Sequence, residues 1–227
     1  MDFKFWPFTA IITAAVFGVT RRAGLSSSVV EQRTCNAQVV SSILTGGSGL
    51  TEGVRMSKNS FPFEEFKDAL AANDEYTKTF KYSELTGVAQ QGLAIVTCMD
   101  SRINPLSVVG MKSGDAKILR NAGARVTKDV LRTLVLATYL LGVKRILIMP
   151  HTNCRMAGVE ESEIHKQIKD KFGVDTSELE FRTVSDQREA LMIDVKRVRK
   201  YKLLNKDVVV GGAIYDVATG KITPVDC

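Results

Sequence analysis

The sequence predicts an α/β fold: a doubly wound, mostly parallel β-sheet with flanking helices and a C-terminal hairpin strand. After residue 56, short apolar segments alternate with segments of helical periodicity, as in chains that build a parallel sheet covered on both faces. Residues 145–149 form an almost continuous apolar run, which is typical of a strand buried on both faces. Residues 218–221, Ala-Thr-Gly-Lys, have the composition of a hairpin turn.

The expected strands are four short apolar segments that contain β-branched residues. They cover residues 93–97, 117–119, 145–149 and 207–214. The second of them runs into a glycine-bearing loop, Asn121-Ala122-Gly123, which indicates a tight turn at its carboxyl end.

The expected helices lie before and between these strands. They cover residues 61–80, as one or two amphipathic helices, and residues 127–141, 160–172 and 186–203. In the first, aromatic and apolar residues such as Phe66 and Leu70 recur at near-helical intervals. Thr127 is a suitable N-cap, and Gly142 follows the same helix as a common terminating residue.

Residues 1–55 differ in character from the rest of the chain. Their apolar run, residues 5–19, is shorter than the ~20 residues that a membrane-spanning helix needs. Residues 26–50 are rich in Ser, Thr, Val and Gly without a sustained period, as in disordered segments. We therefore expect residues 1–55 to be a disordered leader or a wrongly assigned start, and residues 56–227, beginning at Met56, to form the folded domain. On this interpretation the protein is cytoplasmic and has no membrane partner unless the leader is real.

Charge and cysteine usage narrow the possible functions. The net charge of +6 favours anionic partners only weakly. The basic cluster in residues 196–202 is expected to be a solvated helix face rather than a nucleic-acid surface, because no RNA-binding aromatic motif or zinc-finger spacing accompanies it. Of the four cysteines, Cys35 lies in the leader and Cys227 is the last residue, which leaves Cys98 and Cys154 in the core.

Two polar motifs come directly after two of the expected strands. Cys98-Met-Asp100-Ser-Arg102 follows the first strand, and His151-Thr-Asn-Cys154 follows the third. Active sites of open α/β sheets lie beyond the carboxyl ends of the strands, so we expect the motifs to share one crevice. If the chain stays extended after the first strand, the three chemical side chains of its motif project to the same side. In the second motif, a turn that begins a helix would direct both ligands onto one ion.

Cys98, His151 and Cys154 are the expected zinc ligands, with one Zn²⁺ per chain. Two thiolates and one imidazole make a usual zinc shell, and three protein ligands leave the fourth position for water, as in catalytic sites. A buried cysteine alone is more often a core residue than a ligand, but these residues occur together at strand ends. His165 has no such neighbours and is expected on the surface of a helix, without a role in proton transfer.

The spacing of the two motifs, Cys-x-Asp-x-Arg and then His-x-x-Cys about fifty residues later, resembles the signature of the β-class carbonic anhydrases, in particular the short bacterial type. The loop Arg120-Asn-Ala-Gly123 is also similar to that family, and the resemblance covers most of residues 56–225. One departure is Arg155, where the family usually has glycine after its second cysteine. This departure bears more on the catalytic rate and the affinity for anions than on the binding of the metal.

The resemblance implies a zinc-dependent lyase that hydrates carbon dioxide reversibly to bicarbonate by a zinc-bound hydroxide. Asp100 would accept a hydrogen bond from that hydroxide, and Arg102 would pair with Asp100 and keep it ionised. In a closed form known in the family the aspartate occupies the fourth zinc position, so Asp100 is also a conditional zinc ligand. The resemblance further implies a homodimer or higher oligomer, with residues 61–80 lying on the partner and helping to close the carbon dioxide pocket.

Three alternatives remain open at this point. A hydrolase of carbonyl sulfide or carbon disulfide resembles the same family and shares its zinc shell, so only turnover on the gases separates the two. A non-catalytic zinc-binding or thiol-redox module is the second alternative, although the chain has no Cys-x-x-Cys motif. A dinucleotide-binding domain is disfavoured, because no Gly-x-Gly-x-x-Gly follows the first expected strand.

Overall fold

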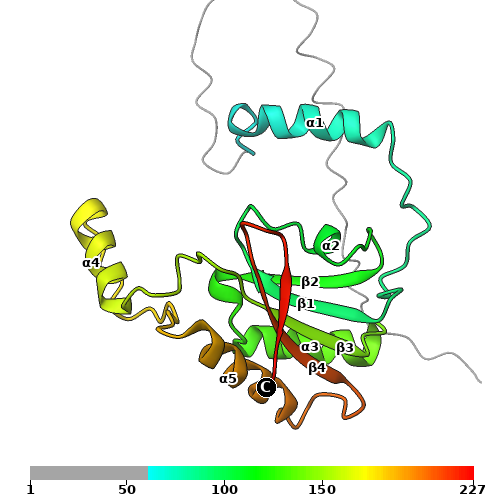
Figure 1. Ribbon diagram of the computed structural model, residues 1–227. Helices are drawn as coiled ribbons and strands as arrows, with labels where there is room; N and C mark the ends of the chain where they lie inside the picture. The colour runs from blue at the N-terminus through cyan, green and yellow to red at the C-terminus, as the bar shows by residue number, and fades with distance from the viewer. Residues whose placement is uncertain (1–60) are drawn as a thin grey trace, which may run out of the picture. The chain divides into compact units, whose positions relative to one another are not determined.

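A five-stranded sheet is the centre of the fold in the computed structural model, which describes residues 61–227 (Figure 1). Its strands are β1 (Leu93–Cys98), β2 (Ala116–Asn121), β3 (Arg145–Met149), β4 (Val209–Tyr215) and β5 (Ile222–Val225). Their order is β2-β1-β3-β4-β5, with β1 to β4 parallel and β5 antiparallel to β4. The predicted α/β fold with a mostly parallel sheet and a C-terminal hairpin is confirmed. The expectations for residues 1–55, for the start at Met56 and for the cytoplasmic location depend on residues outside those described.

Five α-helices and two 3₁₀ turns accompany the sheet in the described residues. They are α1 (Lys67–Thr77), α2 (Pro105–Val108), α3 (Lys128–Leu140), α4 (Glu161–Phe172) and α5 (Gln187–Arg199), with the 3₁₀ turns at Glu64–Phe66 and Ala122–Ala124. The predicted cap is present, because the side chain of Thr127 accepts a hydrogen bond from the backbone N–H of Val130. Helix α2 and the second 3₁₀ turn were not predicted, since segments of four and three residues are too short to show a helical period.

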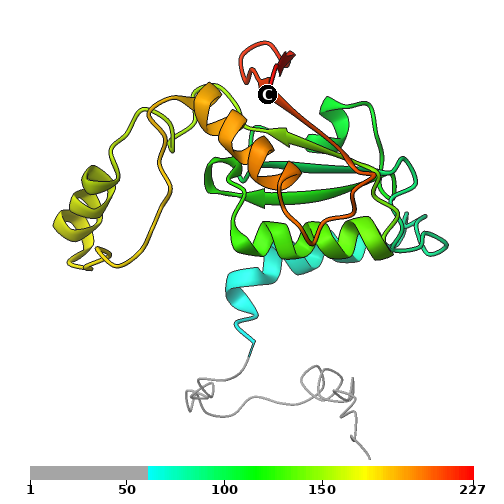
Figure 2. The ribbon, with the colours of Figure 1, turned by 90° about the horizontal axis from the view of Figure 1, so that it is seen from below.

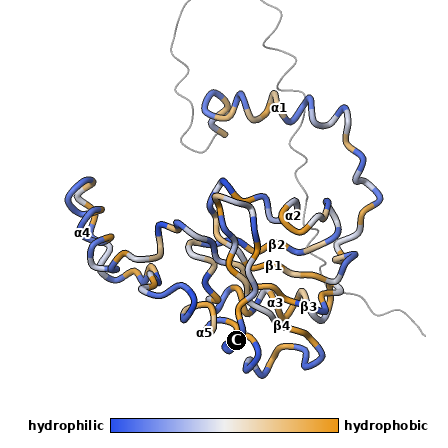
Figure 3. The backbone as a smooth tube through the Cα atoms, in the orientation of Figure 1, coloured by the Kyte–Doolittle hydropathy of each residue, from blue (hydrophilic) through white to orange (hydrophobic). Residues whose placement is uncertain are grey.

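The two faces of the sheet carry two separate cores. Even-numbered residues of β1 up to Val96, and of β3, such as Ile148, pack with α3 and α5, and Figure 2 views the molecule from the side of these helices. Odd-numbered residues, such as Ile95 and Met149, pack with the residues around α2. The strands are mainly hydrophobic, and α4, which contributes to neither core, is mainly hydrophilic (Figure 3). This alternation follows from the two-residue repeat of a strand.

Helix α5 packs directly against β4, and this contact fixes the position of the helix relative to the sheet. A Cβ atom added at Gly212 would come within 2.9 Å of Val195 Cγ2 and 3.1 Å of Leu191 Cδ1. Val195 and Leu191 are buried, and each contributes roughly 1.5–3 kcal/mol by leaving water. The close approach therefore depends on glycine in the strand and places the start of α5 near the polar motifs.

The two surface segments singled out in the sequence are both exposed. Every residue from 61 to 88 is exposed in the single chain, including Leu70, Tyr76 and Phe80. The basic residues of 196–202 are also exposed, as predicted for a solvated face, although the guanidinium of Arg199 donates to the carbonyl oxygen of Val210. Within residues 61–227, no helix has the length and apolar character needed to cross a bilayer.

Candidate metal centre

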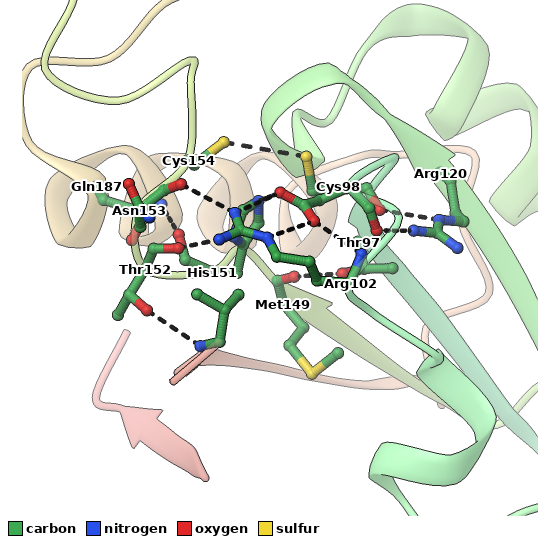
Figure 4. A network of polar contacts seen from close by, with 12 residues as sticks. Thr97, Cys98, Arg102, Arg120, Met149, His151, Thr152, Asn153, Cys154 and Gln187 are labelled. Atoms are coloured by element: carbon green, nitrogen blue, oxygen red, sulfur yellow. Dashed lines mark hydrogen bonds and ion pairs between the residues drawn. The ribbon is translucent and has the colours of Figure 1, made fainter. Parts of the chain in front are cut away.

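The pairing of β1 with β3 brings the two polar motifs together. Thr97 lies opposite Met149 in the parallel register, and its hydroxyl donates a buried hydrogen bond of 2.7 Å to the Met149 carbonyl oxygen. Cys98 and His151 follow these residues at the same edge of the sheet (Figure 4). The crevice expected from the strand ends is therefore present.

The three predicted ligands form a compact donor set. The ligand atoms of Cys98, His151 and Cys154 all lie within 4.8 Å of one another, and all three residues are buried. The two Sγ atoms are 3.9 Å apart. A tetrahedral zinc ion with Zn–S bonds of ~2.3 Å holds two sulfurs roughly 3.8 Å apart. The residues present therefore fit a zinc ion without rearrangement of the two cysteines.

The hydrogen bonds of His151 leave its other ring nitrogen ready for a metal. Nδ1 lies 2.8 Å from the carbonyl oxygen of Thr152, which places the ring proton on Nδ1. Nε2 is buried and has no hydrogen-bond partner among the described residues. A buried polar atom without a partner is costly, and a metal ligand bond removes that cost. The backbone of His151 is fixed as well, because the Gln187 amide donates 2.6 Å to its carbonyl oxygen.

The pKa values of the two thiols are shifted in opposite directions. The Cys154 thiol, together with the backbone N–H groups of Gly123 and Asp100, lowers the pKa of Cys98 to about 4. The neighbouring Cys98 thiolate and burial raise the pKa of Cys154. In the absence of metal the pair therefore keeps one proton between two sulfurs. A divalent cation displaces that proton when it binds both thiolates, which couples binding to pH.

Asp100 and Arg102 form the predicted ion pair, but not through the predicted backbone. Nε and Nη2 of Arg102 lie 2.9 and 2.6 Å from the two carboxylate oxygens of Asp100. The chain turns after Cys98 instead of staying extended, since the Ile103 N–H donates 3.1 Å to the Asp100 carbonyl oxygen. This turn returns Arg102 to Asp100, and the Arg102 bonds hold the pKa of Asp100 well below its usual range. The extended geometry predicted for this motif was therefore wrong.

The second motif also differs from the expected turn into a helix. No helix begins at Cys154, because α4 starts only at Glu161. Asn153 instead has φ 53°, a left-handed conformation that asparagine tolerates better than most residues. Its carbonyl oxygen accepts a bond of 3.2 Å from Arg102 Nη2. The reversal at Asn153, rather than a helical turn, brings Cys154 back beside His151.

The loop after β2 supports the site from a third direction. Gly123 has φ 75°, and a Cβ atom there would lie 3.1 Å from Cβ of Met156. Arg120, at the end of β2, donates 2.9 Å from Nε to the Cys98 carbonyl oxygen. The side-chain amide of Asn121 bonds to the backbone of Arg125 at both its N–H and its carbonyl oxygen. These hydrogen bonds therefore fix the conformation of the loop beside Cys98.

A buried ion pair behind this loop was missed in the sequence. Asp194 of α5 is 2% exposed, and its Oδ2 accepts 2.7 Å from Arg125 Nε and 3.2 Å from the Val126 N–H. The signal was present, because Asp194 lies on the apolar face of α5 beside Leu191 and Val195. A carboxylate within such a face is rarely buried unless it is paired.

The site opens into a cavity of about 490 Å³. It is lined by Cys98, Met99, Asp100, Ser101, Arg102, Ala122, His151, Cys154, Arg155 and Met156.

His165, which was expected on the surface of a helix, is not in this lining. It is half-buried rather than on the open surface, because its ring lies 5.1 Å from the Phe181 ring and Nδ1 lies 2.9 Å from Thr176 Oγ1.

Comparison with known proteins gives consistent results for the described part of the chain. The family model described as carbonic anhydrase matches residues 93–172, and the one described as uncharacterized protein YPR108W-A matches residues 20–52. The chain is 34% identical over 161 residues to β-carbonic anhydrase 1 of Mycobacterium tuberculosis, covering 70% of this chain and 96% of the relative. It is 30% identical to a carbon disulfide hydrolase of Acidithiobacillus thiooxidans, covering 58% and 76%. The crystal structure of a carbonic anhydrase from Streptococcus mutans matches with a TM-score of 0.67 and 35% identity, covering 74% of this chain and 99% of that one.

Proposed function

The chain belongs to the β-carbonic anhydrase family, and from that premise we propose that it hydrates carbon dioxide reversibly to bicarbonate, with one zinc ion held by Cys98, His151 and Cys154. The observation that carries the proposal is the donor set itself. Two sulfurs 3.9 Å apart and a buried imidazole nitrogen without a hydrogen-bond partner among the described residues converge on one point of an open cavity. A zinc ion held by these three residues would lower the pKa of bound water toward ~7 and would supply a nucleophile near neutral pH.

Asp100 is proposed to orient the reacting solvent molecule. Its Oδ2 lies 3.7 Å from His151 Nε2, so the carboxylate borders the point where the ligand atoms converge. Because its pKa is held well below the usual range, Asp100 acts at neutral pH as an acceptor and not as a proton donor. By accepting a hydrogen bond at this place, Asp100 would orient the solvent molecule toward the cavity.

Arg102 is proposed to keep Asp100 in this orientation. Its two bonds to the carboxylate and its bond to the Asn153 carbonyl oxygen join the two motifs across the site. Release of the Arg102 bonds would free Asp100 to turn toward the metal as a fourth ligand. We therefore keep the conditional role of Asp100 in a closed form as part of the proposal.

The cavity wall suits a small apolar substrate. Met99, Ala122 and Met156 contribute apolar surface beside the charged pair, and Met99 is 69% exposed. Neutral carbon dioxide gains from such a surface, whereas a charged product is held only by the polar side of the cavity.

Carbon disulfide or carbonyl sulfide hydrolysis is the second candidate. It is supported by the relative from Acidithiobacillus thiooxidans, whose name is carbon disulfide hydrolase. Carbon dioxide stays the first candidate because the relatives named carbonic anhydrase from Mycobacterium tuberculosis and putative carbonic anhydrase from Bacillus subtilis are 34% and 32% identical with 96% and 88% of their length covered, against 30% and 76% for that hydrolase.

A homodimer or larger assembly through α1 is proposed as the working form. Leu70, Tyr76 and Phe80 are 42%, 50% and 49% exposed in the single chain, and burying such side chains against a second copy is favourable. Leu70→Asp should shift the mass measured by light scattering toward one chain. An unchanged mass, or a wild type that is already monomeric, would remove α1 from the interface.

The test of the proposed function is stopped-flow carbon dioxide hydration by the zinc-loaded full chain, run beside release of sulfide from carbon disulfide and carbonyl sulfide. Carbon dioxide hydration that disappears when the zinc is chelated is the expected result. Sulfide release without hydration would select the second candidate. Zinc binding without turnover on any of the three gases would select the non-catalytic zinc module.

A further inference from the structure

Arg155 follows a predicted metal ligand and is part of the lining of the same cavity. It lines the space of about 490 Å³ together with the three ligand residues, and its side chain is exposed. Its Nη2 donates 2.8 Å to the side-chain oxygen of Gln167 on α4. The Gln167 amide donates in turn 3.1 Å to Glu163. The Arg155 guanidinium is thus positioned by a neutral oxygen, while the Glu163 carboxylate bonds to Gln167.

Arg155 is the uncompensated charge of the cavity lining. Asp100 and Arg102 neutralise each other through bonds of 2.6 and 2.9 Å. Two thiolates balance the double charge of a bound zinc ion. Arg120 is also near but donates to the carbonyl oxygens of Cys98 and Asp100 and is not part of the lining. In the part of the chain that the structure describes, Arg155 makes no ion pair, so with a zinc ion balancing the two thiolates the lining would have a net positive charge.

The substrate and the product of the proposed reaction interact differently with this positive charge. Carbon dioxide is neutral and gains little from a cation. Bicarbonate is an anion whose two oxygens match the fork of N–H donors on a guanidinium. We propose that Arg155 is an anion-binding residue at the mouth of the cavity, which sets the affinity of the site for small monoanions and, resting on the proposed function, for bicarbonate.

The test uses the full chain loaded with Co²⁺ in place of zinc, with thiocyanate as the probe and visible absorption as the readout. Arg155→Gln should weaken thiocyanate binding by roughly 3–10-fold, as expected for a partly exposed charge contact. Arg155→Lys keeps the charge without the fork and should lose less. Arg188→Gln is the matched control, because it removes the same charge from an exposed arginine outside the cavity lining and should have no such effect.

A kinetic measurement extends the test to bicarbonate. On the zinc enzyme, Arg155→Gln should raise the KM for bicarbonate in the dehydration direction by a similar factor, and the difference from wild type should shrink as salt screens the charge. Equal thiocyanate binding in wild type and Arg155→Gln, or equal weakening in Arg188→Gln, overturns the proposal. If Arg155→Gln loses its metal, thiocyanate binding is compared in Arg155→Lys and in the wild type at increasing salt. Weaker binding in both comparisons supports the proposal, and unchanged binding overturns it. A wild type that binds thiocyanate through Arg155 but does not hydrate carbon dioxide keeps the anion site and rejects only the proposed function.

Discussion

The Sγ atoms of Cys98 and Cys154 lie 3.9 Å apart although 56 residues separate the two cysteines in the chain. The distance is too long for a disulfide bond of ~2.05 Å and matches two sulfurs on one tetrahedral zinc ion. It results from the register of β1 and β3, which ends both strands at the same edge. The spacing therefore fits two ligands of one metal ion.

Replacement of either cysteine should remove the metal. We expect about one zinc ion per wild-type chain, and a large loss of zinc in Cys98→Ser and Cys154→Ser, because two ligands do not hold the ion in competition with a chelator. Zinc content after dialysis, measured by mass spectrometry, checks this. Cys227→Ser is the control, since Cys227 is exposed and outside the donor set. Full zinc content in Cys154→Ser would contradict the assignment.

Asp100→Asn should separate metal binding from catalysis. The three ligands are untouched, so zinc content should stay near that of the wild type. The neutral amide is a weaker hydrogen-bond acceptor than the carboxylate, so the rate of carbon dioxide hydration should fall on the order of 10²-fold. Asp129→Asn, which alters an exposed ion pair on α3, serves as the control in the same stopped-flow assay. Undiminished hydration in Asp100→Asn would remove Asp100 from the mechanism.

Asp194→Asn should destabilise the fold without removing a ligand. It leaves the Arg125 guanidinium, whose side chain is 14% exposed, without its buried partner. Breaking such a pair costs about 3–5 kcal/mol, or roughly 6–20 °C in Tm for a domain of this size. The exposed pair in the control Asp129→Asn should cost less than about 1 kcal/mol. Calorimetric melting of the zinc-loaded proteins distinguishes the two, and equal shifts would show that the buried pair adds nothing.

Asp216 should make stability depend on pH in the acid range. The Ala218 N–H and further bonds, including one from the Thr152 hydroxyl, lower the pKa of Asp216 in the folded chain. A lowered folded pKa stabilises above the ordinary aspartate value of ~3.9, and this stabilisation is lost as the pH falls below that value. Asp216→Asn should thus be less stable than wild type at neutral pH, and this difference should be smaller at pH ~3. Urea unfolding in the presence of a chelator at both pH values measures this, and a constant difference would contradict it.

The strand ends were predictable because parallel strands carry a strong local signal. Apolar runs located β1 and β3, and the rule that sites gather at carboxyl ends then placed Cys98 and His151 together. The local path between ligands was not predictable in the same way. The left-handed Asn153 is bonded to the distant Arg102, and the turn at Asp100 is held by hydrogen bonds from Arg102 and Ile103, and no periodic pattern reveals either of them.

The support behind the ligands was the least visible in the sequence. Gln187 and Asp194 reach the site from α5, tens of residues after the motifs, through contacts that exist only once the helix is packed on β4. Asp194 left one trace, a charge on an apolar helix face. Gln187 left none, because a polar residue in the first turn of a helix is ordinary.

Gly123→Ala should weaken both the fold and the metal site, for two separable reasons. Gly123 has φ 75°, which costs a residue with a Cβ atom about 1–2 kcal/mol, and the new methyl would also lie 3.1 Å from Cβ of Met156. The backbone N–H of Gly123 helps to lower the pKa of Cys98, so a displaced loop should also reduce zinc affinity. Adding Met156→Gly relieves the contact but not the backbone cost, and the double variant should recover only part of the lost Tm. Zinc competition and melting of the single and double variants test this, and complete recovery would show that the left-handed backbone imposes no cost.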